Sequence, residues 1–296
     1  MKCTVYEKLI QGVRSLPDIS DVLECSYDWR DSILNSCAVV AGMISAKVCQ
    51  DAAKPPNAAD PKLFILAHSL GGLVVKAAVA GGMIHPGRID RLVFIGCPQL
   101  GSPAAFRSMY SDVDLPFFAQ VTSLFRTLGK QQFKTHLLHS FRTFPSLSEL
   151  LPEQSINYLY YSVVSRANPL SERYMDETRR AGALAAQAVF VKADRIIQDA
   201  RVPTFAIYTA TSSEFQTDHD YVVRGVDRPA GYDIEKVYHL DWDGDGTVPE
   251  YSAKGGEFCQ RLPVVNCKHA TMCESDAVFD RIVVAVPAGK TAKPQA

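Results

Sequence analysis

The stretch Leu63–Val75, LFILAHSLGGLVV, determines how the rest of the chain can be placed. Its apolar start predicts a short buried strand, and its end predicts an apolar helix that reaches about Ala80. Between the two the chain turns at Ser69, which has the small residues Ala67 and Gly71 two positions away on either side. A serine at the apex of a strand, a turn and a helix is typical of a nucleophile elbow.

Small residues are needed around such a serine because its backbone is strained and a larger neighbour would clash with the strand or the helix. The turn lifts the hydroxyl of Ser69 above the sheet and directs the N–H of Leu70 toward a developing oxyanion at the start of the helix. We therefore predict Ser69 as a nucleophile and Leu70 as an oxyanion donor. A glycine-rich turn without a catalytic role is the alternative interpretation.

Composition limits the classes of function. The chain has 296 residues, of which 47% are hydrophobic, enough for one large domain or two small ones. Its 31 basic and 32 acidic residues give a net charge of -1, so no nucleic-acid partner is indicated. The eight cysteines form no C-x-x-C pair, so we expect buried free thiols, no metal site and no cofactor.

The start of the chain, Met1-Lys2-Cys3 and the polar residues after it, lacks the apolar segment of a signal peptide. No apolar run is long enough to cross a bilayer. As written, the sequence therefore predicts a cytoplasmic protein.

Helical and strand patterns alternate along much of the chain, which predicts an α/β fold with a mostly parallel sheet and helices on both faces. Besides the elbow helix, we expect helices over residues 4–15, from a cap at Asp31 to about Cys49, and from about Met272 to Ala285. Besides the elbow strand, we expect strands at Asp21–Ser26, Arg91–Cys97, Val202–Thr209, Lys236–Leu240 and Arg261–Asn266.

The alternation stops between residues 104 and 200. Helical spacing in this block, including a long run at Glu177–Ala200, predicts a helical lid inserted into a core formed by residues 1–103 and 201–285. The lid is the candidate surface for an acyl chain and for peripheral membrane contact, although its aromatic residues could equally form a small core of their own. These are Phe117, Phe118, Phe125, Phe133, Phe141 and Phe144. Residues 286–296 are expected to be a disordered tail.

A serine hydroxyl needs a histidine base that is oriented by a carboxylate. In elbow enzymes the chain order is serine, acid, histidine. Only His269 follows the candidate acids, and it lies between the last strand and the last helix, so it is the predicted base. The other histidines adjoin the elbow, lie in the lid block or precede the acid: His68, His85, His136, His139, His219 and His239.

Three aspartates, Asp241, Asp243 and Asp245, compete as the acid. Asp245 is favoured because glycines on both sides place it in a turn after a strand. The same spacing also copies the start of a calcium-binding EF-hand loop. That interpretation is weakened because Ser252 stands where the loop needs a bidentate glutamate and because Pro249 interrupts it.

Several segments occur in the order found in proteins similar to lecithin:cholesterol acyltransferase, and together they span nearly the whole chain. They are YDWR (Tyr27–Arg30), AHSLGG (Ala67–Gly72), GSP (Gly101–Pro103), FPSLSELLP (Phe144–Pro152), GDGTVP (Gly244–Pro249) and CKHATM (Cys267–Met272). The sequence resembles this α/β-hydrolase family, which includes phospholipases A and phospholipid acyltransferases. The resemblance implies a serine-dependent lipid-ester hydrolase or acyltransferase in which Ser69, Asp245 and His269 are the catalytic triad.

The resemblance has one departure. The family has a section before the helix at residues 4–15 that supplies the first strands of the sheet and the loop with the second oxyanion donor, and the chain as written begins after it. We therefore expect the sheet to lack those strands. The alternative function is a catalytically inactive relative that binds lipid or a protein partner.

Overall fold

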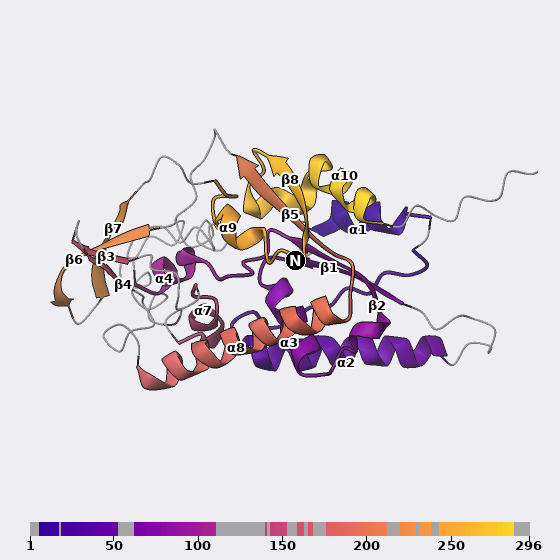
Figure 1. Ribbon diagram of the computed structural model, residues 1–296, viewed down its shortest axis with the longest axis horizontal. Helices are drawn as coiled ribbons and strands as arrows, with labels where there is room; N and C mark the ends of the chain where they lie inside the picture. The colour runs from indigo at the N-terminus through magenta and orange to yellow at the C-terminus, as the bar shows by residue number, and fades with distance from the viewer. Residues whose placement is uncertain are drawn as a thin grey trace, which may run out of the picture.

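The computed structural model describes residues 6–17, 19–52, 62–110, 140, 143–152, 159–162, 165–167, 176–211, 220–228, 231–237 and 243–286. Its centre is a parallel sheet of four strands in the order β1-β2-β5-β8 (Figure 1). The strands are β1 (Leu63–His68), β2 (Ile89–Ile95), β5 (Thr204–Thr211) and β8 (Gln260–Val265). The expected α/β class and these four strands are confirmed, with small shifts at the strand ends.

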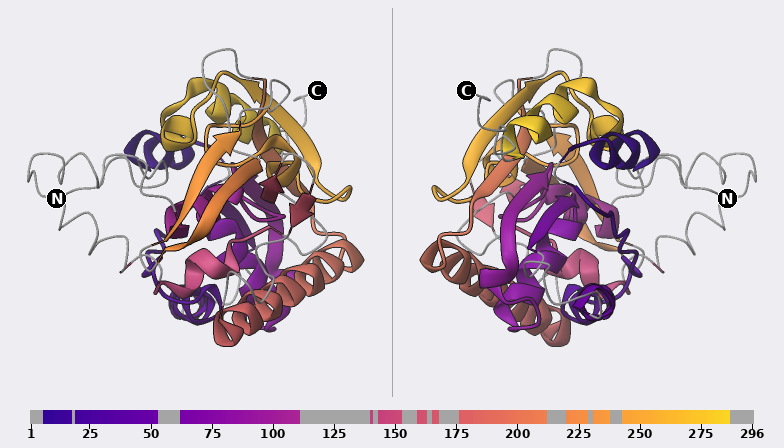
Figure 2. Two further views of the ribbon diagram at one scale, coloured as in Figure 1. Left: turned by 90° about the vertical axis from the view of Figure 1, so that its left-hand side faces the viewer. Right: turned by 90° about the vertical axis from the view of Figure 1, so that its right-hand side faces the viewer.

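Helices cover both faces of the sheet, as the alternating pattern predicted. One face carries α1 (Glu7–Arg14) and α10 (Asp276–Ala285), and the other carries α2 (Ile33–Ala52), α3 (Gly71–Ala80) and α8 (Glu177–Asp199) (Figures 1 and 2). Between β1 and β2 the chain forms the short helix η2 (Pro86–Arg88).

The core follows the alternation of the central strand β2. Leu92 and Phe94 pack into the cluster with α2, α3 and α8, whereas Val93 and Ile95 pack into the cluster with α1 and α10. All four side chains are fully buried. Successive residues of a strand point to opposite faces, so a continuous apolar run is what a strand covered on both sides requires.

The long helix α8 falls within the block that the sequence predicts to be a lid. Its small and apolar residues pack along α3, in the same core cluster as Leu92 and Phe94 of the central sheet, and it leads the chain back into β5. Between these two helices the buried ammonium of Lys76 lies 2.7 Å from the carboxylate of Asp194. A helical pattern in the sequence does not show which layer a helix joins. The ion pair that links α8 to α3 joins residues far apart in the sequence, so it becomes visible only in the structure.

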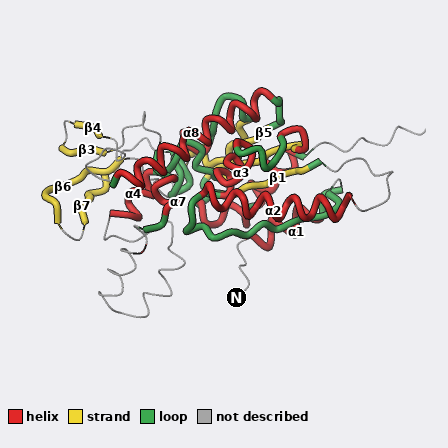
Figure 3. Tube along the Cα trace, turned by 90° about the horizontal axis from the view of Figure 1, so that it is seen from below, coloured by secondary structure: helices red, strands yellow, loops and turns green. Residues whose placement is uncertain are grey.

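The inserted block is not wholly helical. Besides α4 (Pro103–Tyr110) and α7 (Pro145–Glu149), a second sheet of four strands lies at the end of the molecule away from the central sheet (Figures 1 and 3). Its order is β4-β3-β6-β7, with β4 (Ser165–Ala167), β3 (Leu159–Ser162), β6 (Asp220–Arg228) and β7 (Gly231–Val237). Its strands β3 and β4 precede α8 in the sequence, whereas β6 and β7 follow β5. Short-range sequence patterns cannot show pairing between segments so far apart.

Part of the lid prediction lies outside the described residues. This applies to all the aromatic residues named above except Phe144, to the end of the strand expected at Lys236–Leu240, and to the tail beyond residue 286. The ring of Phe144 makes an edge contact with Trp29, with ring centroids 5.4 Å apart.

The strand expected at Asp21–Ser26 is wrong. The segment has no regular secondary structure and pairs with no strand, and in the described part of the chain β1 pairs only with β2. Asp21 forms an ion pair with Lys47 of α2, and Glu24 forms one with Arg14 of α1, so the acidic side chains hold the segment to helices. Five of the six residues of β1 are only half-buried, as suits an edge strand.

The cap of α2 also differs from the prediction. Ser32, rather than Asp31, precedes the helix, and its hydroxyl accepts a hydrogen bond from the Leu34 N–H at 3.1 Å. The carboxylate of Glu149 in α7 accepts from the Ser32 hydroxyl and from the Ile33 N–H, both at 2.6 Å. Burial raises the pKa of Glu149 despite these bonds. A carboxylate from a distant segment therefore completes the start of α2.

In the part of the chain that the structure describes, no helix has both the length and the apolar character needed to cross a bilayer.

Candidate active site

Ser69 lies at the sharp turn between β1 and α3, with a backbone φ of 54°. A residue with a side chain rarely adopts this left-handed conformation, and such strain is often found at functional positions. The turn is held by a hydrogen bond from the Ser69 N–H to the Ile95 carbonyl at 3.0 Å. The N–H of Leu70, at the start of α3, has no acceptor among the described residues. The elbow geometry is therefore present.

The close approach of α3 to β2 explains a second glycine of the motif. A Cβ at Gly72 would lie 2.5 Å from the Sγ of Cys97, which follows β2. The thiol of Cys97 donates a hydrogen bond to the Ala67 carbonyl at 3.1 Å, so it cannot move away without cost. Burial raises the pKa of Cys97 to about 12, and the thiol stays protonated as a donor. Cys97 therefore acts as a buried free thiol beneath the elbow.

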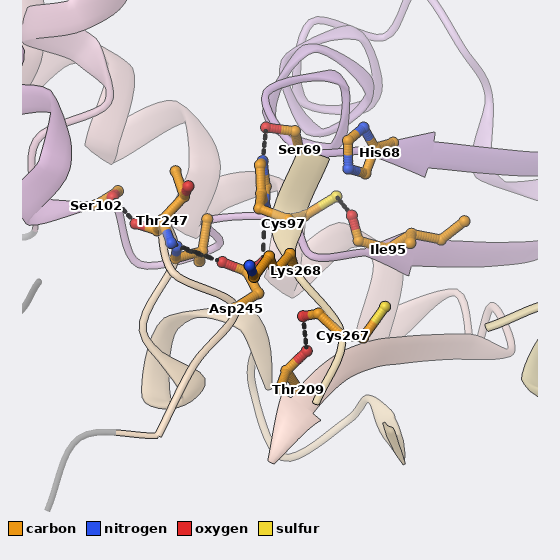
Figure 4. Close-up of polar contacts among 12 residues, drawn as sticks. His68, Ser69, Ile95, Cys97, Ser102, Thr209, Asp245, Thr247, Cys267 and Lys268 are labelled. Carbon is orange, nitrogen blue, oxygen red and sulfur yellow. Dashed lines mark hydrogen bonds and ion pairs between the residues drawn. The ribbon is translucent and has the colours of Figure 1, made fainter. Parts of the chain in front are cut away.

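The structure brings the three predicted triad residues together. The Nε2 of His269 is 2.8 Å from the Oγ of Ser69, and its Nδ1 is 2.7 Å from an oxygen of Asp245. Figure 4 shows Ser69 and Asp245 at the two ends of this chain of contacts. His269 begins the short helix η4 (His269–Glu274), and its N–H also donates to the Asp245 carbonyl at 2.8 Å. Backbone and side chain together fix the imidazole over the elbow.

The carboxylate of Asp245 has both oxygens engaged. Oδ2 faces His269, while Oδ1 accepts hydrogen bonds from the N–H groups of Thr247 at 3.0 Å and Val248 at 2.7 Å. The side chain is only 1% exposed. An oxygen pair that is buried and already bonded is well placed to orient a histidine but poorly placed to bind a cation.

The calcium interpretation gains no support from the described residues. No group of three potential ligands that could hold a metal ion occurs among them. Asp241, the first residue of the EF-hand-like spacing, lies outside the described part of the chain.

Several of the segments quoted from the sequence meet around Asp245. The Ser102 hydroxyl of the GSP segment donates to the Thr247 carbonyl at 2.8 Å, next to Asp245. From α9 (Glu250–Ala253), the Ser252 hydroxyl donates to the Gly101 carbonyl at 2.6 Å. The Ser102 N–H donates in turn to the Leu150 carbonyl of the FPSLSELLP segment at 2.8 Å. These segments are far apart in the sequence, and together they hold the loop that carries the acid.

Two further residues, His68 and Gly96, lie in the site although no sequence motif marks them as site residues. The ring of His68 lies against that of His269, with centroids 5.0 Å apart, and its Nδ1 is 3.0 Å from the Tyr6 hydroxyl. Burial, with a further contribution from His269, lowers the pKa of His68 to about 3, so it is neutral at physiological pH. Gly96, which follows β2 and has a φ of 53°, lies directly beneath Asp245 and His269.

Gly96 provides a test of how tightly the site is packed. A Cβ at this position would lie 2.6 Å from the Met272 Sδ and 3.0 Å from the Asp245 Oδ2. We expect Gly96→Ala to reduce the free energy of unfolding by about 3 kcal/mol, from left-handed strain and overpacking. Urea denaturation measures the change.

Gly42 of α2 is the matched control, because a Cβ there would meet nothing within 4 Å. Gly42→Ala should leave the protein as stable as wild type or more stable by about 0.5–1 kcal/mol. A Gly96→Ala variant as stable as the Gly42→Ala variant would contradict the packing described here.

Comparisons with known proteins add a structural match. No protein-family profile matches the sequence, and no curated protein does. Among solved structures, a chain of "The crystal structure of Tle4-Tli4 complex" matches with a TM-score of 0.58 and 14% sequence identity, over 90% of this chain and 68% of that chain. This chain has an α/β-hydrolase fold. At so low an identity the match shows the fold alone, and the chemistry has to be argued from the site.

Proposed function

We propose that the protein is a serine-dependent lipid-ester hydrolase or O-acyltransferase that works through an acyl-serine intermediate. The observation that carries this proposal is the hydrogen-bonded chain from Ser69 through His269 to Asp245. It occurs on a strained elbow of an α/β-hydrolase fold, where this arrangement activates a serine.

The first half of the reaction makes the acyl-serine. His269 takes the proton of the Ser69 hydroxyl as Oγ attacks the ester carbonyl carbon, and the carbonyl oxygen becomes an oxyanion. The Leu70 N–H and the start of α3 stabilise that negative charge. The imidazolium of His269 then gives its proton to the leaving alcohol as the carbon–oxygen bond breaks.

The second half releases the acyl group. His269 deprotonates a water molecule or an acceptor alcohol, which attacks the acyl-serine, and the proton returns to the Ser69 Oγ. Asp245 keeps a proton on Nδ1 of His269 throughout, so that Nε2 is free to accept. Water gives hydrolysis and an alcohol gives acyl transfer, and the exclusion of water decides between them.

The lipid character of the substrate rests on the family resemblance. The segments that carry it are those that surround the acid and the elbow, and phospholipid-like esters are the substrates that the resemblance implies. Peripheral membrane contact through residues 104–200 belongs to the same proposal. Hydrolysis of a short-chain ester tests whether the protein cleaves esters at all. Hydrolysis of a phospholipid ester tests the substrate class.

The experiment compares purified wild type with Ser69→Ala on both substrates. We expect the wild type to release alcohol from a short-chain ester and fatty acid from phospholipid vesicles, and the variant to do neither above the uncatalysed rate. Addition of a sterol or diacylglycerol then shows whether an alcohol competes with water. Wild-type turnover no greater than that of Ser69→Ala would contradict the proposal and favour the catalytically inactive relative.

A further inference from the structure

The YDWR segment (Tyr27–Arg30) makes a set of contacts that are separate from those among Ser69, His269 and Asp245. The guanidinium of Arg30 donates to both oxygens of Asp28, at 2.8 and 2.6 Å, and closes the turn. Trp29 then faces Phe144 at the base of the inserted block, with the edge contact already described. Tyr27 points the other way, to the elbow, where its hydroxyl oxygen lies 3.7 Å from the position of a Cβ on Gly71.

The Tyr27 hydroxyl is a donor that has no acceptor in the part of the chain that the structure describes. It makes no hydrogen bond to any residue that the structure describes, although the side chain is half-buried. The pKa of Tyr27 lies well above its usual value. Burial is the main cause, and the nearby Tyr6 and Cys97 raise the pKa further. The phenol therefore keeps its proton at physiological pH.

The position of the hydroxyl matters because of its neighbours. Gly71 is the first residue of α3, and the N–H of Leu70 beside it also has no acceptor among the described residues. Two donors that have no partner among the described residues, one from the backbone and one from a side chain, thus lie at the same turn next to Ser69. Glycine at position 71 keeps the space in front of the hydroxyl open.

We propose that Tyr27 is a further catalytic residue, whose hydroxyl donates the second hydrogen bond to the oxyanion opposite the Leu70 N–H. The inference rests on the proposed function, since it concerns the same tetrahedral intermediate. Tyrosine hydroxyls serve in such sites, and a donor aimed at developing charge stabilises the transition state more than the bound ester.

Tyr27→Phe removes the hydroxyl and keeps the ring. We expect kcat for a short-chain ester to fall about 10²-fold with little change in KM, because the hydrogen bond forms to the oxyanion and not to the substrate. The rate of labelling of Ser69 by a fluorophosphonate should fall by a similar factor, because its phosphoryl oxygen occupies the same position. The labelling rate needs no turnover and therefore tests Tyr27 separately from substrate choice.

Tyr208→Phe is the control for the loss of a buried phenol hydroxyl, because Tyr208 lies in β5, two strands away from β1, and its ring rather than its hydroxyl is what packs in the cluster with Val248 and Ala253. It should be labelled and should turn over ester as wild type does, and thermal unfolding should show all variants folded. If Ser69 is labelled equally fast in wild type and Tyr27→Phe, Tyr27 only packs against the elbow and the inference is wrong. If labelling is the same in wild type and Ser69→Ala, the proposed function itself is wrong, and the role of Tyr27 is lost with it.

Discussion

Replacing His269 with alanine is expected to lower kcat for a short-chain ester by about 10⁴- to 10⁶-fold. The imidazole is the only group that the structure places within hydrogen-bond reach of the Ser69 hydroxyl among the described residues, at 2.8 Å. Without it the serine has no base, and the departing alcohol has no acid. Steady-state kinetics on purified protein measure the effect, with active-enzyme concentration set by absorbance.

His85 provides the matched control for this substitution. It lies exposed before η2, where its ring accepts a hydrogen bond from the Gly87 N–H at 3.1 Å, and it is not part of the site. His85→Ala should keep kcat within about twofold of wild type, as surface changes away from the chemistry usually do. Comparable losses in both variants would indicate that unfolding, and not the missing base, explains the result.

Asp245→Asn is expected to reduce kcat by about 10⁴-fold while the fold stays intact. Its amide oxygen can keep the hydrogen bonds from Thr247 and Val248, which leaves the amide N–H₂ facing Nδ1 of His269. The imidazole must then accept at Nδ1 and carry its proton on Nε2, where it can no longer take the proton of Ser69. The variant therefore holds His269 in the wrong tautomer, which lowers kcat and leaves the melting temperature unchanged.

Asp243 tests the choice of acid, because it competes with Asp245 in the sequence. In the structure its carbonyl accepts a hydrogen bond from the Glu250 N–H at 2.9 Å, and its carboxylate does not contact His269. Asp243→Asn should therefore retain most of the wild-type kcat. A larger loss in Asp243→Asn than in Asp245→Asn would reverse the assignment.

The parts of the site that the sequence predicted are those set by local rules. Small residues around Ser69 indicate a strained turn. The chain order of elbow enzymes identifies His269 among the seven histidines as the candidate base. Glycines on both sides of Asp245 report the turn that presents its carboxylate. For these residues the predicted positions and the observed contacts agree, because each depends on only a few neighbouring residues.

The parts that the sequence did not predict depend on contacts between distant segments. The interpretation of Asp21–Ser26 as a strand failed because its acidic residues pair with α1 and α2. The packing of α8 on α3 is likewise a contact between distant segments that a linear pattern does not show. His68 could be excluded as the base by its position, but its packing against His269 could not be read from a linear pattern. The same holds for Gly96, whose need for glycine arises only from the acid and base above it.

The most direct measurement of the central claim is mass spectrometry of the intact and digested protein after exposure to a fluorophosphonate. If Ser69 is a nucleophile activated by His269, the wild type should gain one phosphonyl group on the peptide that contains Ser69. The Ser69→Ala variant should gain none, and His269→Ala should react far more slowly. Equal labelling of wild type and Ser69→Ala, or an adduct on another residue, would contradict the account.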